Sequence, residues 1–353
     1  MGEKLNEHKE YIEDGNLVSE ISGTWEAVTK DANGEAHIHT LHKHSKKLRP
    51  LPEEPNLDEL LVRKAIPTII RPTRRATPKH TEQEALIFGD AQVPFQDERA
   101  MNLALTAIRE LMPNQVVFVG DMLDLPGLSR FQQRNEWQSA TQGAIDYYHQ
   151  FLAQVRANAP NADITVIAGN HEERMTNYVQ RNAAEVLRLR RAGEHLSVLS
   201  IRNLVRFDDL DIRYVDGYPN GTYYLEPNLQ LMHGTNVAKG GSNAAKYLEQ
   251  ERASTIYGHT HRLELAQRTY PTENGRYTVT AASPGALAKV DGSVPGFRYS
   301  VSEQGEVVKR AENWQQGLLQ IHHEGLHHDI TPIQFTERGM VLNGKRFDLP
   351  EAA

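Results

Sequence analysis

Three short apolar segments, each followed by glycine and a polar residue, constrain the fold of this 353-residue chain most strongly. They cover residues 85–88, 115–119 and 163–167, and they lead into Gly-Asp, Gly-Asp and Ala-Gly-Asn. Helical patterns separate them: Asp97 can cap a helix that runs to residue 111, and another covers about 143–158. This alternation is typical of a largely parallel sheet, which places its active site where the strands end.

The chain after about residue 262 favours strands. We expect them at residues 263–270, 276–282, 297–301 and 316–322. Asn274-Gly275 is typical of a hairpin turn, and so is Glu324-Gly325, which is flanked by His322, His323, His327 and His328. We expect these strands to extend a second sheet within a domain that covers residues 81–353.

Residues 1–80 form an expected accessory region. Segments 25–29 and 36–41 are typical of two strands joined around Asn33-Gly34. Between His42 and His80 the chain carries ten Lys or Arg against four Asp or Glu. This excess indicates either an arm that binds a polyanion or a solvated linker.

The composition limits the chemistry. The chain has no cysteine, so any metal must be held by nitrogen and oxygen ligands. The formal charge of −7 disfavours a dedicated nucleic-acid coat protein. The charged N-terminus lacks the pattern of a signal peptide, and no apolar run is long enough for a membrane helix. We therefore expect a cytoplasmic protein without a membrane partner; nothing in the sequence indicates its oligomeric state.

Five polar signatures occur in order along the chain. They are Gly89-Asp90-Ala91-Gln92, Gly120-Asp121-Met-Leu-Asp124, Gly169-Asn170-His171-Glu172, His233-Gly234 and Gly258-His259-Thr260-His261. Hydrolysis of a phosphate ester needs an activated nucleophile and neutralised phosphoryl oxygens, and two divalent ions provide both. Asp121 is the natural carboxylate to bridge two ions. The other candidate ligands are Asp90, Gln92, Asn170, His233, His259 and His261.

Taken together, these signatures resemble those of the calcineurin-like metallophosphoesterase superfamily. The resemblance covers about residues 85–265 and implies a two-sheet β-sandwich flanked by helices, an α/β fold. It implies one ion held by Asp90, Gln92, Asp121 and His261, and a second held by Asp121, Asn170, His233 and His259. It also implies that a hydroxide bridging the ions is the nucleophile. The end of the chain, from Asn313 onward, is similar to phage- and prophage-encoded members.

The same resemblance implies roles around the substrate. His171 is expected to contact the phosphate and to protonate the leaving group, and Asp124 to orient that histidine. Asn170 is expected to contact the substrate as well as a metal. Apart from the resemblance, the position of Arg130 just after the second signature indicates that its loop overhangs the site and reaches the substrate.

Position 92 departs from the family pattern, because it is usually histidine and is glutamine here. A neutral amide oxygen is a harder ligand than imidazole, so we expect the first ion site to favour Mn²⁺ or Mg²⁺ over Zn²⁺. For the pair of ions we expect Mn²⁺, with Mg²⁺, Fe, Zn²⁺ and Ni²⁺ as alternatives. The sequence favours a phosphodiesterase or nuclease acting on nucleic acid or nucleotides. It leaves open a phosphomonoesterase and a weakly active metal-binding interaction module.

Overall fold

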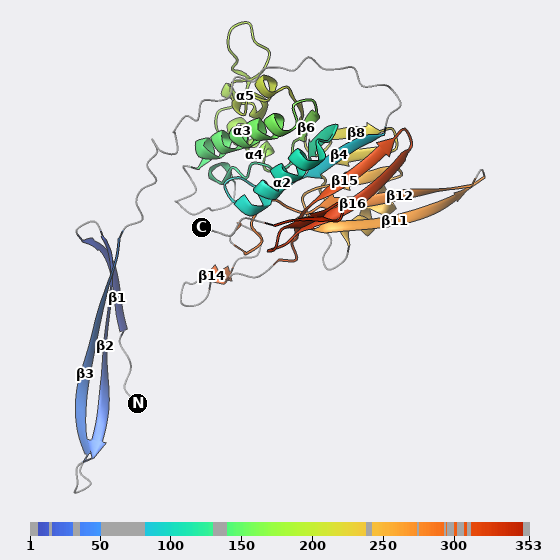
Figure 1. Cartoon of the computed structure of the whole chain (residues 1–353). Coiled ribbons are helices and arrows are strands. Elements are labelled where there is room, and N and C mark those ends of the chain that lie inside the picture. The colour runs from blue at the N-terminus through green and yellow to red at the C-terminus, as the bar shows by residue number, and fades with distance from the viewer. Residues whose placement is uncertain are drawn as a thin grey trace. The chain divides into compact units, whose positions relative to one another are not determined.

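The computed structural model describes eleven stretches of the chain (Figure 1). They are residues 6–13, 16–30, 36–50, 82–129, 140–237, 242–273, 275–292, 294, 300–301, 307–308 and 312–348. The chain divides into two units, Met1–Thr68 and Ile69–Ala353. The boundary expected near residue 80 lies outside the described residues.

The first unit contains a three-stranded antiparallel sheet in the order β1-β2-β3. Its strands are β1 (Asn6–Glu13), β2 (Asn16–Lys30) and β3 (Ala36–Pro50). The two strands expected from the sequence lie within β2 and β3, which pair from Lys30 opposite Ala36 to Asn16 opposite Pro50. Both are longer than expected. The expected turn at Asn33-Gly34 lies outside the described residues.

One sheet of the second unit has six strands in the order β16-β15-β4-β5-β6-β7. The strands from β4 to β7 are parallel, as the sequence predicts, and β15 pairs antiparallel with β4. These strands are β4 (Gln83–Phe88), β5 (Gln115–Phe118), β6 (Asp163–Ile167), β7 (Ile212–Val215), β15 (Gln316–Glu324) and β16 (His327–Phe335).

The other sheet has five strands in the order β11-β12-β10-β9-β8. Its three inner strands are parallel, and each edge strand is antiparallel to its neighbour. The strands are β8 (Thr222–Glu226), β9 (Leu229–Met232), β10 (Ser254–Tyr257), β11 (Leu263–Thr272) and β12 (Gly275–Pro284).

Helices connect these strands. They are α2 (Glu98–Leu111), α3 (Thr141–Asn158), α4 (Glu173–Asn182), α5 (Ile201–Leu204) and α6 (Asn243–Gln250), with short 3₁₀ turns η1 (Pro126–Leu128), η3 (Val186–Arg188) and η4 (Phe207–Leu210). The predicted cap of α2 is confirmed, since the Asp97 side chain accepts a hydrogen bond from the Arg99 backbone N–H at 2.9 Å. Among the described residues, no helix is both long and apolar enough to cross a bilayer.

Alternation along β4 shows how the layers pack. Leu86 and Phe88 belong to the core shared with α2 and α3, whereas Ala85 and Ile87 belong to the core between the two sheets. On the far face of the second sheet, α6 packs through its own core cluster. The order is therefore helices, sheet, sheet, helix, and the expected two-sheet sandwich flanked by helices is confirmed (Figure 1).

The C-terminal strands depart from the prediction in one respect. β11 and β12 do extend the second sheet, but β15 pairs with β4 and so extends the first. The sequence could not show which sheet β15 would join. The strands that precede it leave an open edge on each sheet, and a strand that covers either edge has the same apolar alternation. Of the strand expected at 297–301, only Ser300–Val301, which is β13, lies among the described residues; it pairs with β14 (Val307–Val308). A last hairpin joins β17 (Met340–Leu342) and β18 (Lys345–Phe347).

The β15–β16 hairpin is confirmed at Gly325, which has a positive φ of 61°. One of its histidines does not behave as a hairpin-tip residue. His323 is only 3% exposed, and its ring nitrogens lie 2.8 Å from Glu226 Oε1 and 3.0 Å from Gln115 Oε1. Because Glu226 is in β8 and Gln115 in β5, this histidine joins the two sheets at the end opposite the polar signatures.

Candidate metal centre

The five polar signatures lie on loops that directly follow parallel strands. Asp90, Asp121 and Asn170 follow β4, β5 and β6, and His233 and His259 follow β9 and β10. Both sheets therefore contribute, as expected for side chains at the carboxyl ends of parallel strands.

Several of these residues have a strained backbone. Their φ angles are positive, which few non-glycine residues adopt. These residues are Asp90 (54°), Gln92 (49°), Asp121 (52°), His259 (68°) and His261 (55°). Such strain persists only where the surrounding structure imposes it, so these loops are held in a conformation that directs the side chains inward.

Two glycines allow the loops to approach each other closely. A Cβ atom at Gly169 would overlap the carboxylate of Asp121, and one at Gly258 would lie 2.9 Å from Asp90 Oδ2. These two glycines are therefore required by packing against the acidic side chains.

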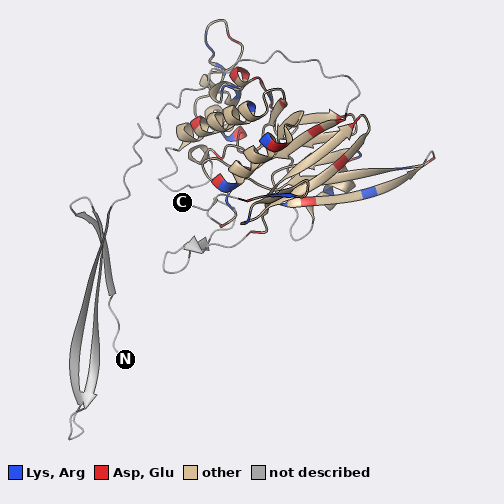
Figure 2. Ribbon diagram, in the orientation of Figure 1, with Lys and Arg blue, Asp and Glu red and all other residues tan. Residues whose placement is uncertain are grey.

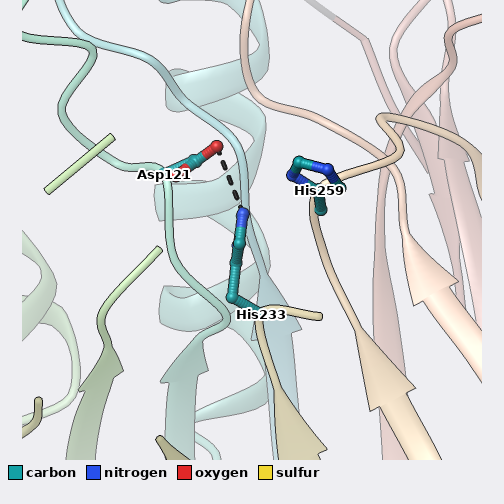
Figure 3. A group of neighbouring side chains, drawn as sticks. All are labelled: Asp121, His233 and His259. Carbon is teal, nitrogen blue, oxygen red and sulfur yellow. Dashed lines mark ion pairs between the residues drawn. The ribbon is translucent and has the colours of Figure 1, made fainter. Parts of the chain in front are cut away.

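Asp121, His233 and His259 form the tightest group of candidate ligands (Figure 3). Their ligand atoms all lie within 4.8 Å of one another. His233 Nε2 lies 3.2 Å from Asp121 Oδ2 and 3.1 Å from Asn170 Oδ1. The structure thus brings together all four residues expected to hold the second ion.

The ring of His233 is oriented by its other nitrogen. Nδ1 lies 2.8 Å from the backbone carbonyl oxygen of Val119 and donates to it, which leaves Nε2 directed at Asp121 and Asn170. Ligand histidines in proteins are commonly fixed in this way.

The residues expected to hold the first ion also lie together. His261 Nε2 lies 3.2 Å from Asp90 Oδ1 and 3.0 Å from Gln92 Nε2. Asp90 is fully buried and accepts hydrogen bonds from the His259 backbone N–H at 3.0 and 3.1 Å. The Trp314 ring covers His261, with the ring centroids 4.2 Å apart.

The charges of the centre are strongly coupled. Burial raises the pKa of Asp121. The adjacent His171 and His233 lower it by more than burial raises it, so the pKa of Asp121 lies well below its usual range. Burial lowers the pKa of His233, yet the Asp121 carboxylate raises it to about 9. Burial and the positive charge of His233 lower the pKa of His259 to about 4. The site is therefore organised around a buried anion surrounded by imidazoles.

This donor set fits divalent metal ions. It consists of carboxylate, amide and imidazole groups, which suit Mn²⁺, Fe, Zn²⁺ and related ions. The buried Oε1 of Gln92 has no hydrogen-bond partner among the described residues. A buried acceptor without a donor is costly, and coordination of a cation would satisfy it after rotation of the amide.

His171 lies at the edge of this centre. Its Nδ1 is 2.5 Å from Asp124 Oδ1, and its Nε2 is 3.7 Å from Asp121 Oδ2. Burial lowers the pKa of His171, but Asp121 and Asp124 raise it above its usual value. The arrangement can hold a proton on a histidine directed at the metal centre.

Two residues close to His171 have no role in the sequence interpretation. Arg174 donates to the Asp124 carbonyl oxygen at 2.5 Å, and its Nη2 lies 2.9 Å from His171 Nε2. The carboxylate of Glu172, only 2% exposed, accepts backbone N–H bonds from Asp121, Leu123 and Gly169 at 3.0, 2.9 and 2.8 Å. The signal for Arg174 was its position one helical turn after His171, and Glu172 belonged to the third signature.

The remaining substrate contact expected from the sequence cannot be placed. Arg130 lies outside the described residues. Trp314 was part of a segment linked only to phage-encoded proteins, and nothing local indicated that it would cover His261.

A family model described as calcineurin-like phosphoesterase matches residues 84–263, which include all seven expected metal ligands. Among curated proteins, the Gene 54 protein of Mycobacterium phage D29 is 25% identical over 193 residues, covering 52% of this chain and 71% of its own length. The Gene 54 protein of Mycobacterium phage L5 is 23% identical over 259 residues, covering 70% and 92%. Vps29 from Chaetomium thermophilum has 10% identity and a TM-score of 0.31, covering 72% of this chain and 87% of its own.

Proposed function

Because the chain belongs to the calcineurin-like phosphoesterase family, and is therefore a metal-dependent phosphoesterase similar to phage-encoded proteins, we propose that it hydrolyses phosphodiesters of nucleic acids or nucleotides. The observation that carries the proposal is the convergence of candidate ligands from both sheets on Asp121.

In this proposal, one ion would be held by Asp90, Gln92, Asp121 and His261. The other would be held by Asp121, Asn170, His233 and His259. When bound, the ions supply an activated water molecule as nucleophile and neutralise charge on the phosphoryl oxygens.

His171 completes the site as the general acid. Asp124 accepts from Nδ1 and so directs Nε2 toward the substrate, where a proton can pass to the leaving oxygen. Asn170, beside it, contacts the phosphoryl group. The orienting role fits the burial of Asp124. The general-acid role fits the partial exposure of His171, whose side chain is 12% exposed.

A diester substrate is favoured by two features outside the centre. One is the basic stretch between His42 and His80, and the other is the similarity to phage proteins. A phosphomonoesterase is the second candidate. Gln92 supports a third, a weakly active metal-binding interaction module, since an amide oxygen holds a divalent ion less firmly than an imidazole nitrogen does. The same residue favours Mn²⁺ at this site. The phage similarity favours the host cytoplasm as the place of action.

The test is an assay with bis(p-nitrophenyl) phosphate and p-nitrophenyl phosphate in the presence of Mn²⁺, Zn²⁺ or a chelator. We expect hydrolysis of the diester with Mn²⁺, loss of activity with chelator, and slower turnover of the monoester. Preferential turnover of the monoester would favour the phosphatase. If neither ester turns over in protein that binds two ions per chain, only the interaction module stands.

A further inference from the structure

Helix α4 begins at Glu173, just after His171 at the edge of the metal centre. Along it, Arg174, Tyr178 and Arg181 are spaced i, i+4 and i+7, which places them on one face. Met175 and Val179 are buried on another face and anchor the helix to the core. The first face therefore points away from the core and begins at the site.

Arg174 connects this face to the chemistry. Its Nη1 lies 3.1 Å from Asp124 Oδ1, and its Nη2 lies 2.9 Å from His171 Nε2. A guanidinium group can only donate, so the histidine nitrogen accepts in this contact. Phosphate oxygens are better acceptors for a guanidinium than a neutral imidazole is. An entering phosphate can therefore take over Arg174, which frees His171 Nε2 to take up a proton from water and later donate it to the leaving oxygen.

Tyr178 lies one turn further along and is 42% exposed, which is high for an aromatic side chain. Arg181 follows it, also exposed, with its Nε donating to the Asn177 carbonyl oxygen at 3.0 Å. Among the described residues, Arg181 has no acidic partner. Charges of both signs are scattered over the described part of this unit (Figure 2), so net charge does not distinguish this face. What sets it apart is an exposed aromatic ring between two arginines on the helix that follows His171.

Single-stranded nucleic acid has the chemistry that fits this face. Its phosphates pair with arginine, and its unpaired bases stack on aromatic rings. A duplex keeps its bases stacked on one another and cannot use Tyr178 in this way. From Arg174 to Arg181 the helix rises about 10 Å, enough for more than one nucleotide to lie along it.

We infer that the face formed by Arg174, Tyr178 and Arg181 binds single-stranded nucleic acid and leads it into the metal centre. This inference rests on the proposed function and narrows its substrate from phosphodiesters in general to unpaired strands. Tyr178 and Arg181 bind nucleotides next to the scissile phosphate and take no part in the reaction itself.

The test compares Tyr178→Ala and Arg181→Ala with matched controls in the full-length, metal-loaded protein. Tyr224→Ala removes a tyrosine that is 54% exposed in β8, and Arg109→Ala removes an exposed arginine of α2. We expect kcat/KM for a single-stranded oligothymidylate to fall about 5- to 150-fold in each α4 variant, the range of one lost stacking or phosphate contact. The controls should stay near wild type, and hydrolysis of bis(p-nitrophenyl) phosphate should be unchanged in all four variants.

Binding gives a second readout that does not depend on turnover. Fluorescence anisotropy with labelled oligothymidylate and chelator-treated protein should show weaker binding by the α4 variants, whereas binding of a duplex should not depend on Tyr178. Unchanged oligothymidylate affinity in both α4 variants would overturn the inference, as would equal losses on the oligonucleotide and the small diester. If the wild-type protein fails to hydrolyse the small diester, the proposed function fails, and the binding measurement still decides whether this face holds single strands.

Discussion

His171 is held between a carboxylate and a guanidinium group. Asp124 lies at its Nδ1, and Arg174 lies at its Nε2. It lies in the centre but outside the ligand set, so its loss should affect proton transfer more than metal binding. We predict that His171→Ala reduces turnover of a phosphodiester by about 100-fold or more, the usual contribution of a general acid. The metal content, measured by elemental analysis, should remain that of the wild type.

The leaving group provides the control for this prediction. A good leaving group such as p-nitrophenolate needs little protonation, so the variant should lose less activity on that ester than on an alkyl ester. Near-normal turnover of the alkyl ester by fully metallated His171→Ala would remove the general-acid assignment.

Gln92 is the one residue where this chain leaves the family pattern, and its buried Oε1 has no hydrogen-bond partner in the described part of the chain. Gln92→His would place an imidazole beside His261 and Asp90. We predict tighter binding of one divalent ion and a shift of preference from Mn²⁺ toward Zn²⁺, because nitrogen is the softer ligand. Metal titration of the wild type and this variant measures both.

Gln92→Ala is the matched comparison, and it should weaken the same ion while leaving the other in place. The proposed second ion would be held by Asp121, Asn170, His233 and His259, so position 92 should not affect it. If all three proteins bind two ions with equal affinity and preference, position 92 is not a ligand.

At the scale of secondary-structure elements, the loops after β5 and β6 are joined by one buried carboxylate. Glu172 accepts three backbone N–H bonds, from Asp121, Leu123 and Gly169. In Glu172→Gln the amide group would face at least one of these donors without accepting from it. We predict that the free energy of unfolding falls by roughly 1–3 kcal/mol, the cost of a buried unsatisfied donor.

Urea denaturation of the metal-free protein measures this loss, with Glu185→Gln, an exposed glutamate after α4, as the control. Burial and the negative charge of Asp121 also raise the pKa of Glu172, so the site already tolerates this anion at a cost. Equal stability of Glu172→Gln and the control variant would show that the carboxylate does not hold the loops together.

Much of the fold follows from patterns that act locally. The parallel strands, the Asp97 cap of α2 and the placement of polar residues at strand ends could be predicted because periodicity and capping involve neighbours in the sequence. The pairing of β15 with β4 could not, because it joins residues more than 200 positions apart, such as Leu319 and Ile87. His323 was missed for the same reason, since its partners come from two other strands.

The residues of the site also differ in whether they could be predicted from the sequence. Its candidate ligands carried local signatures, whereas Trp314 reaches His261 only through the tertiary fold. Arg174 lies between these cases: its spacing from His171 was visible in the sequence, but its contact with the ring nitrogen depends on the geometry after β6. Residues that support a site are thus harder to predict than those that form it.

At the scale of the whole molecule, the remaining question is what the first unit contributes. Its strand β3 contains the first part of the basic stretch that begins at His42. If this stretch is an arm that binds a polyanion, the affinity for nucleic acid should depend on the salt concentration. Each Lys or Arg that neutralises a phosphate of a single strand contributes about 0.7 to the slope of log affinity against log salt. We therefore predict that neutralising four residues of β3 lowers this slope by up to about 3. The four are Lys43, Lys46, Lys47 and Arg49.

The control neutralises four exposed basic residues of the second unit. They are Arg109, Arg338, Lys345 and Arg346. Only the β3 variant should show the flattened salt dependence with labelled oligothymidylate, and both variants should hydrolyse bis(p-nitrophenyl) phosphate at the wild-type rate, since the metal centre is intact. Because phosphate pairing is independent of base stacking, the β3 variant should lose affinity for single strands and duplexes alike, unlike Tyr178→Ala. An unchanged salt slope in the β3 variant would show that these four residues do not bind a polyanion, and it would leave α4 as the proposed nucleic-acid contact.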